Sequence, residues 1–222
     1  MKVYKFGGAS VKSADAVRNV GEILKKKDDN LVVVISAMGK TTNLMETLVK
    51  AYFDNSDEKW SIFSDFKAYH TEICENLFGG NIPETITAFF DEAAQKLKKI
   101  PSLDFNFEYD QVVSFGELVS TRIVSDYLNR NDVNNQWVDV RSCLRTDDVF
   151  RDASVDWELT ETLSKRVFQF KEHQIYITQG FIGSTPSSLT TTLGREGSDF
   201  TAAIFGNVLN AESVWFWKDV PG

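Results

Sequence analysis

The chain has 222 residues, of which 42% are hydrophobic, and its formal net charge is −8. This length and composition suit one globular domain with a substantial apolar core. The negative charge argues against general binding to nucleic acid or membranes, and no apolar run reaches the roughly 20 residues of a membrane span. The two cysteines, Cys74 and Cys143, lack metal-ligand spacing and are expected to be reduced thiols of a cytoplasmic protein.

The first part of the chain predicts a β-α-β unit. A short apolar strand is expected over residues 3–6, and a helix over 13–27, where Ser13 is a good N-cap and consecutive lysines suit the C-terminal end. Residues 31–36, LVVVIS, are β-branched and continuously apolar, as in a parallel strand buried on both faces. Two strands joined by a helix indicate a parallel sheet with a right-handed crossover.

Helices are expected over the middle of the chain, from about residue 43 to 99, with one of them opening at Pro83, and a further helix over 111–130. The remaining elements are expected in this order: strand 136–140, helix 155–170, strand 174–183, loop or hairpin 180–197, helix 198–211 and strand 213–219. This alternation predicts an α/β fold in one domain, arranged as a three-layer α/β/α sandwich around an open, mainly parallel sheet.

The segment KFGGAS, residues 5–10, places Lys5, Gly7 and Gly8 at the end of the first strand. A strand interior disfavours paired glycines, because glycine loses much entropy on ordering and packs nothing. Their backbone N–H groups could instead approach an anion closely, beside the charge of Lys5. The residues alone leave two interpretations open, a phosphate site and a plain Gly-Gly turn beside a solvated lysine.

The segment SAMGKTTN, residues 36–43, follows a strand and contains Gly39, Lys40 and Thr41. A P-loop also needs a glycine five residues before Gly39, and the chain has Val34 there. The P-loop is therefore rejected. The segment is interpreted as a strand-to-helix turn, with Thr42 near the helix start.

Glu117 lies in an apolar stripe of the expected helix, in line with Val113, Val124 and Leu128. A carboxylate in such a place must find a cation or be neutralised. The cation is either an internal arginine such as Arg122 or the ammonium group of a ligand. Before any resemblance is considered, the internal pair is the favoured interpretation.

Two further segments carry charged groups near the ends of expected elements. In TTTLGREGSD, residues 190–199, Arg195 could hold a carboxylate bidentately, and the helix start at Ser198 and Asp199 favours anions. Ser198 also suits an N-cap, and Asp199 suits the first helical turn. In WKDVPG, Lys218 and Asp219 stand either at the carboxyl end of a strand, where α/β proteins bind ligands, or in a plain turn.

In order along the chain, six segments resemble the aspartate kinases of the amino acid kinase family: KFGGAS, VVVISAMGKTTNL, FGELVST, TQGFIG, TTTLGREGSD and WKDVPG. The resemblance implies an amino acid kinase-like fold and the transfer of the γ-phosphoryl group of MgATP to the β-carboxylate of L-aspartate, the first step of lysine, threonine and methionine synthesis. The implied ligands are L-aspartate, ATP and Mg²⁺, with the ion bound with the nucleotide and no metal site of the protein's own. A homo-oligomer is expected for the full-length protein, without nucleic acid or membrane partners.

The resemblance also implies residue roles. Lys5 would bridge the two anionic reactants and Asp199 would orient it, so these two are the expected catalytic residues. The expected phosphate or ATP contacts are Lys5, Gly7, Gly8, Ser10, Lys218 and Asp219. The expected aspartate contacts are Ser36, Ala37, Thr42, Glu117, Arg195 and Ser198. Among these, Glu117 would receive the ammonium and Arg195 the α-carboxylate.

Three positions depart from the family pattern: Ala9 where threonine is usual, Glu196 where many members have glycine, and Lys218 where threonine is frequent. The family continues past WKDVPG with further nucleotide-binding residues and regulatory ACT domains. Residues 1–222 are therefore expected to be the N-terminal part of the catalytic domain.

Two alternatives stay open: another carboxylate kinase of this fold, such as glutamate 5-kinase or acetylglutamate kinase, and a non-catalytic ligand-binding fragment. Glu117 argues against acetylglutamate, whose amine is capped.

Overall fold

The structure is a computed structural model that describes residues 1–218, so the expected nucleotide contact Asp219 lies outside the described residues. Within them, a five-stranded sheet has the order β3-β4-β2-β1-β7, and every neighbouring pair is parallel. Its strands are β1 (Lys2–Phe6), β2 (Leu31–Ile35), β3 (Asn135–Val138), β4 (Ile175–Gln179) and β7 (Ser213–Trp217). The predicted parallel sheet is confirmed.

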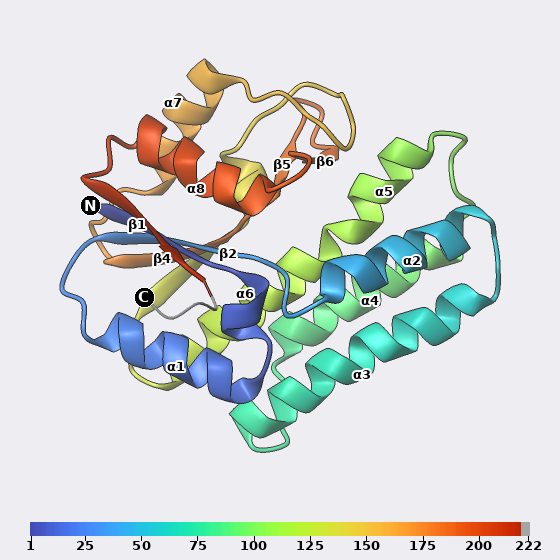
Figure 1. Cartoon of the computed structure of the whole chain (residues 1–222), viewed down its shortest axis with the longest axis horizontal. Coiled ribbons are helices and arrows are strands. Elements are labelled where there is room, and N and C mark those ends of the chain that lie inside the picture. The colour runs from blue at the N-terminus through green and yellow to red at the C-terminus, as the bar shows by residue number, and fades with distance from the viewer. Residues whose placement is uncertain (219–222) are drawn as a thin grey trace.

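Helices cover both faces of this sheet, with α7 and α8 on one face and α1 and α6 on the other, as Figure 1 shows. The other helices, α2 to α5, form a lobe beside the sheet. The helix bounds are α1 (Ala14–Lys25), α2 (Thr41–Phe53), α3 (Glu58–Phe78), α4 (Glu84–Lys98), α5 (Phe105–Val113), α6 (Phe115–Arg130), α7 (Trp157–Val167) and α8 (Gly197–Val208). This is the predicted three-layer α/β/α arrangement. In residues 1–218, no helix has the length and apolar character needed to cross a membrane.

Shorter elements complete the chain. The 3₁₀ turns are η1 (Gly8–Val11) and η2 (Val140–Ser142). The expected loop or hairpin is a hairpin, in which β5 (Ile182–Ser184) pairs antiparallel with β6 (Thr190–Thr192). It stands beside α5, to which Gln111 joins it by hydrogen bonds in both directions with the backbone of Thr190.

Local sequence explains the first β-α-β unit. The Ser13 hydroxyl caps α1 by accepting from the backbone N–H of Ala16, and Val17, Val20 and Leu24 are buried on one face of the helix. All five residues of β2 are buried, as expected for a strand between two neighbours and two helical layers.

The single helix predicted over residues 111–130 is wrong, because the structure has two helices that meet at Ser114. The Ser114 hydroxyl donates to the carbonyl oxygen of Gln111 (3.2 Å), a local bond that competes with helix continuation. Just after the break, a Cβ on Gly116 would lie 3.3 Å from side-chain carbons of Ala37 and Thr41. The start of α6 therefore packs tightly against the turn that follows β2.

The strand predicted over residues 174–183 is also divided, since β4 ends at Gln179 and β5 begins at Ile182. Gly180 stands between them, and a Cβ on it would lie only 2.5 Å from Cβ of Ser198. The chain turns here against the first turn of α8. The segments TQGFIG and TTTLGREGSD are thereby brought into contact.

Candidate functional site

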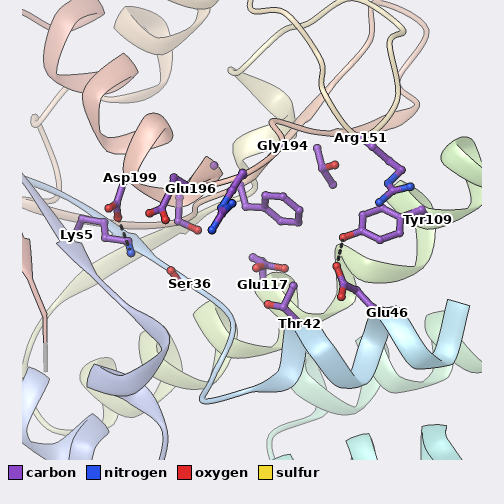
Figure 2. A pocket seen from close by; sticks show the side chains of 15 residues that line it. Lys5, Ser36, Thr42, Glu46, Tyr109, Glu117, Arg151, Gly194, Glu196 and Asp199 are labelled. Atoms are coloured by element: carbon purple, nitrogen blue, oxygen red, sulfur yellow. Dashed lines mark hydrogen bonds and ion pairs between the residues drawn. The ribbon is translucent and has the colours of Figure 1, made fainter.

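A cavity of about 480 Å³ opens beside the carboxyl ends of β1 and β2, the edge of an open α/β sheet at which ligands bind. Figure 2 shows the side chains that line it. They are Lys5, Ser36, Thr42, Glu46, Tyr109, Glu117, Arg151, Phe181, Thr192, Gly194, Arg195, Glu196, Gly197, Ser198 and Asp199. Segments from nearly the whole chain meet here.

Lys5 and Asp199 form an ion pair at one end of the cavity (Figure 2), with 2.7 Å between Lys5 Nζ and Asp199 Oδ1. Lys218 Nζ lies 3.2 Å from the other carboxylate oxygen. Burial would raise the pKa of Asp199, but the hydrogen bond and charge of Lys5, followed by those of Lys218, hold it below its ordinary value. The ionised Asp199 therefore fixes the largely buried Lys5 ammonium beside the cavity.

The glycine pair after β1 has a packing role. A Cβ on Gly8 would lie 2.6 Å from the carbonyl oxygen of Ala37, so η1 can approach the turn after β2 only with glycine there. The backbone N–H of Gly7 and the hydroxyl of Ser10 both donate to the carbonyl oxygen of Trp217 (3.3 Å each). These three residues do not line the main cavity, and their contact with phosphate stays a prediction.

Ser10 and Lys218 instead line a separate cavity of about 240 Å³, which residues of α1 also wall. Its walls also include Phe6 and Trp217, whose rings stack with centroids 5.7 Å apart. Ser10 and Lys218, two of the expected ATP contacts, thus line this smaller cavity and not the main one.

Glu117 is 2% exposed, on the first turn of α6. Burial raises its pKa to about 8, against hydrogen bonds from its own backbone N–H and that of Ala37. Its Oε2 has no hydrogen-bond partner among the residues that the structure describes. Arg122 pairs with Asp126 instead (2.7 Å), so the favoured internal pair of Glu117 with Arg122 is wrong.

Ala37, an expected aspartate contact, is buried and does not line the cavity. Its backbone N–H bonds to the carboxylate of Glu117. In this structure Ala37 therefore acts on Glu117, while Ser36 and Thr42 on either side of it face the cavity directly.

Arg195 and Ser198 line the cavity, but the local geometry differs from the prediction. The N-cap of α8 is Glu196, not Ser198, and Glu196 has the left-handed φ of 59°. Glycine adopts this conformation without strain, whereas glutamate is strained in it. Asp199 does lie in the first turn of α8, as predicted.

Some cavity residues were missed by sequence reasoning: Glu46, Tyr109, Arg151, Phe181 and Thr192. The Tyr109 hydroxyl donates to Glu46 Oε1 (2.7 Å), and the Arg151 guanidinium stands over the Tyr109 ring, 4.4 Å from its centroid. Figure 2 places this group at the end of the cavity opposite Lys5. Phe181 and Thr192 lie inside the segments TQGFIG and TTTLGREGSD, so the sequence does carry a signal for them. The other three share no motif, because three separate segments supply them.

One cavity at the carboxyl edge of a parallel sheet is surrounded by a lysine held by an aspartate, an exposed arginine and a buried carboxyl group that pairs with no cation among residues 1–218. These features define the chain as an α/β protein whose cavity presents groups of both charges. The model of the amino acid kinase family matches residues 1–222, and the chain belongs to this family.

The relatives by sequence are aspartokinases. The chain is 36% identical to lysine-sensitive aspartokinase 3 of Escherichia coli (strain K12), over 99% of this chain and 49% of that protein. It is 35% identical to aspartokinase 1, chloroplastic, of Arabidopsis thaliana, over 99% of this chain and 40% of the relative. The chain thus spans about half the length of the curated relatives it matches.

Solved structures agree with this assignment. E. coli aspartokinase III in complex with aspartate and ADP (R-state) superposes with a TM-score of 0.89 and 34% identity, over all of this chain and 50% of that one. The same enzyme in complex with lysine and aspartate (T-state) gives a TM-score of 0.90 and 35% identity, again over all of this chain and 50% of the other.

Proposed function

We propose that this chain is the catalytic part of an aspartate kinase, which transfers the γ-phosphoryl group of ATP to the β-carboxylate of L-aspartate. The observation that carries the proposal is Glu117. Its buried carboxyl group pairs with no cation in the part of the chain that the structure describes, and it lines the same cavity as Arg195 and Lys5. A free α-amino acid with an acidic side chain supplies one group for each of these residues.

In the proposed complex, the aspartate ammonium pairs with Glu117 and the α-carboxylate with Arg195. The β-carboxylate then points toward Lys5, at the end of the cavity where Asp199 holds the lysine (Figure 2). Ser36, Thr42 and Ser198 add hydroxyl groups to the same wall, and Ala37 orients Glu117 through its backbone N–H.

The β-carboxylate is ionised at neutral pH, so it needs no general base. The barrier lies in bringing it in line with an anionic phosphoryl group, and a positioned cation between the two lowers that barrier. Lys5 is proposed to be that cation, with Asp199 preventing its side chain from moving away.

We propose that ATP lies on the β7 side of Lys5, where Ser10 and Lys218 line the smaller cavity together with Ala9, the residue that follows Gly7 and Gly8 in the chain. Asp219, which lies outside the described residues, is proposed to contact ATP because the family resemblance implies it. Mg²⁺, bound with the nucleotide, would neutralise phosphate charge. Asp199 is already engaged by two lysines, which fits an ion held mainly by the phosphates.

Hydroxylamine trapping of the acyl phosphate tests this function directly. The protein is incubated with ATP, Mg²⁺ and, separately, L-aspartate, L-glutamate or N-acetyl-L-glutamate. Of the three acids, only L-aspartate is expected to give a hydroxamate. Formation from N-acetylglutamate without formation from aspartate would reject both the substrate and the role of Glu117, because an acetylated amine carries no positive charge.

A cytoplasmic location is also proposed. Cys74 and Cys143 are both free and buried, which suits a reducing compartment such as the cytoplasm. Assembly of the full-length protein into a homo-oligomer stays a prediction, which light scattering after size-exclusion chromatography tests.

A further inference from the structure

Asp110 is a fully buried carboxylate on α5 that has no place in the reaction described above. It accepts hydrogen bonds from two segments far away in the sequence. Oδ2 accepts from the backbone N–H groups of Arg151 (3.0 Å) and Thr192 (2.9 Å), and Oδ1 accepts from the Thr192 hydroxyl (2.7 Å). One side chain thus joins a helix, a turn and the end of a hairpin strand.

Both bonded segments form part of the cavity wall, since Arg151 and Thr192 line it. They also contact each other, because the N–H of Ala153 donates to the carbonyl oxygen of Thr192 (3.0 Å). The turn at Arg151 and Asp152 also packs closely against the segment that leads to Arg195, because a Cβ on Gly194 would lie 2.7 Å from Asp152 Oδ1. The turn and the strand end form one unit with Asp110 beneath it.

The backbone of this turn is strained and must be held by its surroundings. Arg151 has a φ of 73°, a conformation that L-residues adopt only when the surroundings hold them in it. A buried carboxylate is itself unfavourable unless it is hydrogen-bonded, and burial raises the pKa of Asp110 to about 6 in spite of its bonds to Thr192 and Arg151. Asp110 and this turn are therefore two unfavourable features that stabilise each other.

Only two residues, Leu193 and Gly194, separate Thr192 from Arg195. A shift of Thr192 is therefore passed to the arginine that is proposed to hold the α-carboxylate. Lys5 and Asp199 pair with each other at the other end of the cavity (Figure 2), and among the described residues Asp110 bonds to neither of them.

We propose that Asp110 is a positioning residue for the amino-acid substrate, which it serves by fixing Thr192 and Arg151 on the cavity wall. The inference rests on the proposed function for its kinetic part. Its structural part, the fixing of two backbone amides, does not depend on what the substrate is.

The test compares Asp110→Ala, which removes all three bonds, with Asp110→Asn. The Asn amide oxygen can still accept from both backbone N–H groups, and its NH₂ group can donate to the Thr192 hydroxyl. The KM for aspartate is expected to rise about 10-fold or more in Asp110→Ala and about 2- to 3-fold in Asp110→Asn, because truncation leaves buried donors without a partner. The KM for ATP and kcat are expected to change less than 3-fold.

Glu108→Gln is the matched control. Glu108 is 2% exposed on the same helix and pairs with Lys96 (2.5 Å), but it does not line the cavity. This variant also loses a buried charge on α5 and is expected to melt earlier with an unchanged KM for aspartate. An equal rise of the KM in Glu108→Gln and Asp110→Ala would mean that general loosening of α5, not positioning, causes the effect, and would overturn the proposal.

Hydrogen exchange of the Arg151 and Thr192 amides gives a readout without substrate. Both amides are expected to exchange at least 10-fold faster in Asp110→Ala, with β2 unchanged and most of the protection restored in Asp110→Asn. Unchanged exchange overturns the positioning role even if the KM rises, and faster exchange with an unchanged KM overturns its importance for substrate. If the parent forms no aspartyl hydroxamate, the proposed function fails, and the exchange data alone decide whether Asp110 anchors the wall.

Discussion

Replacement of Glu117 by glutamine is expected to make the ligand-free protein more stable, by an amount that grows with pH. Burial raises the pKa of Glu117 from 4.5 to about 8 in the folded protein. Between these values the folded chain keeps a proton that the unfolded chain releases, so the parent loses stability as pH rises. Below pH 4.5 both states are protonated and the penalty vanishes.

The size of the effect follows from this window. Each pH unit within it costs about 1.4 kcal/mol, so at pH 7 the carboxyl group destabilises the parent by roughly 3 kcal/mol relative to pH 4.5. A neutral amide of the same shape does not titrate. For a domain of this size, the Tm of Glu117→Gln is expected to exceed that of the parent by roughly 10 °C at pH 7, and by little at pH 4.5.

Thermal and urea unfolding of both proteins from pH 4.5 to pH 8 provide the measurement. The quantity to follow is the difference in free energy of unfolding between the two proteins, because the contributions of all other titrating groups cancel in it. Glu22→Gln is the comparison at an exposed site, since its side chain is 62% exposed on α1, where it lies 3.7 Å from Lys25 Nζ, so this substitution changes no buried group. A difference between parent and Glu117→Gln that stays constant from pH 5 to pH 8 would refute the reasoning, since Glu117 would then be ionised in the empty protein.

The same proton links the stability prediction to the proposed substrate. If an ammonium group pairs with Glu117, binding ionises the carboxyl group and releases its proton below pH 8. Aspartate affinity is then expected to rise up to tenfold per pH unit between about pH 5 and pH 8, with close to one proton released per aspartate at pH 7. Calorimetry in buffers of different ionisation enthalpy measures this release, and its absence would argue against ammonium recognition by Glu117.

The other predictions concern the charged groups of the cavity. Lys5→Met should lower kcat by roughly 10²–10³ with an unchanged circular dichroism spectrum, because one preorganised cation is lost; turnover near that of the parent would exclude the proposed role. Arg195→Ala should weaken aspartate binding by about 2–5 kcal/mol and ATP binding far less, and steady-state kinetics with the opposite pattern would reverse the assignment. Glu196→Gly should raise the free energy of unfolding by about 1 kcal/mol, because the φ of 59° strains glutamate but not glycine. A lower Tm than the parent's would show that the turn is not strained.

Much of this protein is determined by local sequence. The continuous apolar run of β2 predicts a strand between two neighbours, and Ser13 predicts the start of α1, because both signals act within a few residues. The residues expected to bind the substrate also stand mostly in recognisable segments. Lys5, Thr42 and Arg195 do line one cavity.

Tertiary structure alone decided the rest. Arg122 pairs with Asp126 one turn further along the same helix, and the carboxyl group of Glu117 accepts instead from the backbone N–H of Ala37, in the turn after β2. At the divided helix, the bond from Ser114 to Gln111 is local, but the close packing of Gly116 against Ala37 and Thr41 joins distant segments. Asp110 is the clearest case, because its partners lie 41 and 82 residues further along the chain. A carboxylate in a helix has no local property that reveals such partners, since burial and hydrogen bonding are set by which segments the fold brings together.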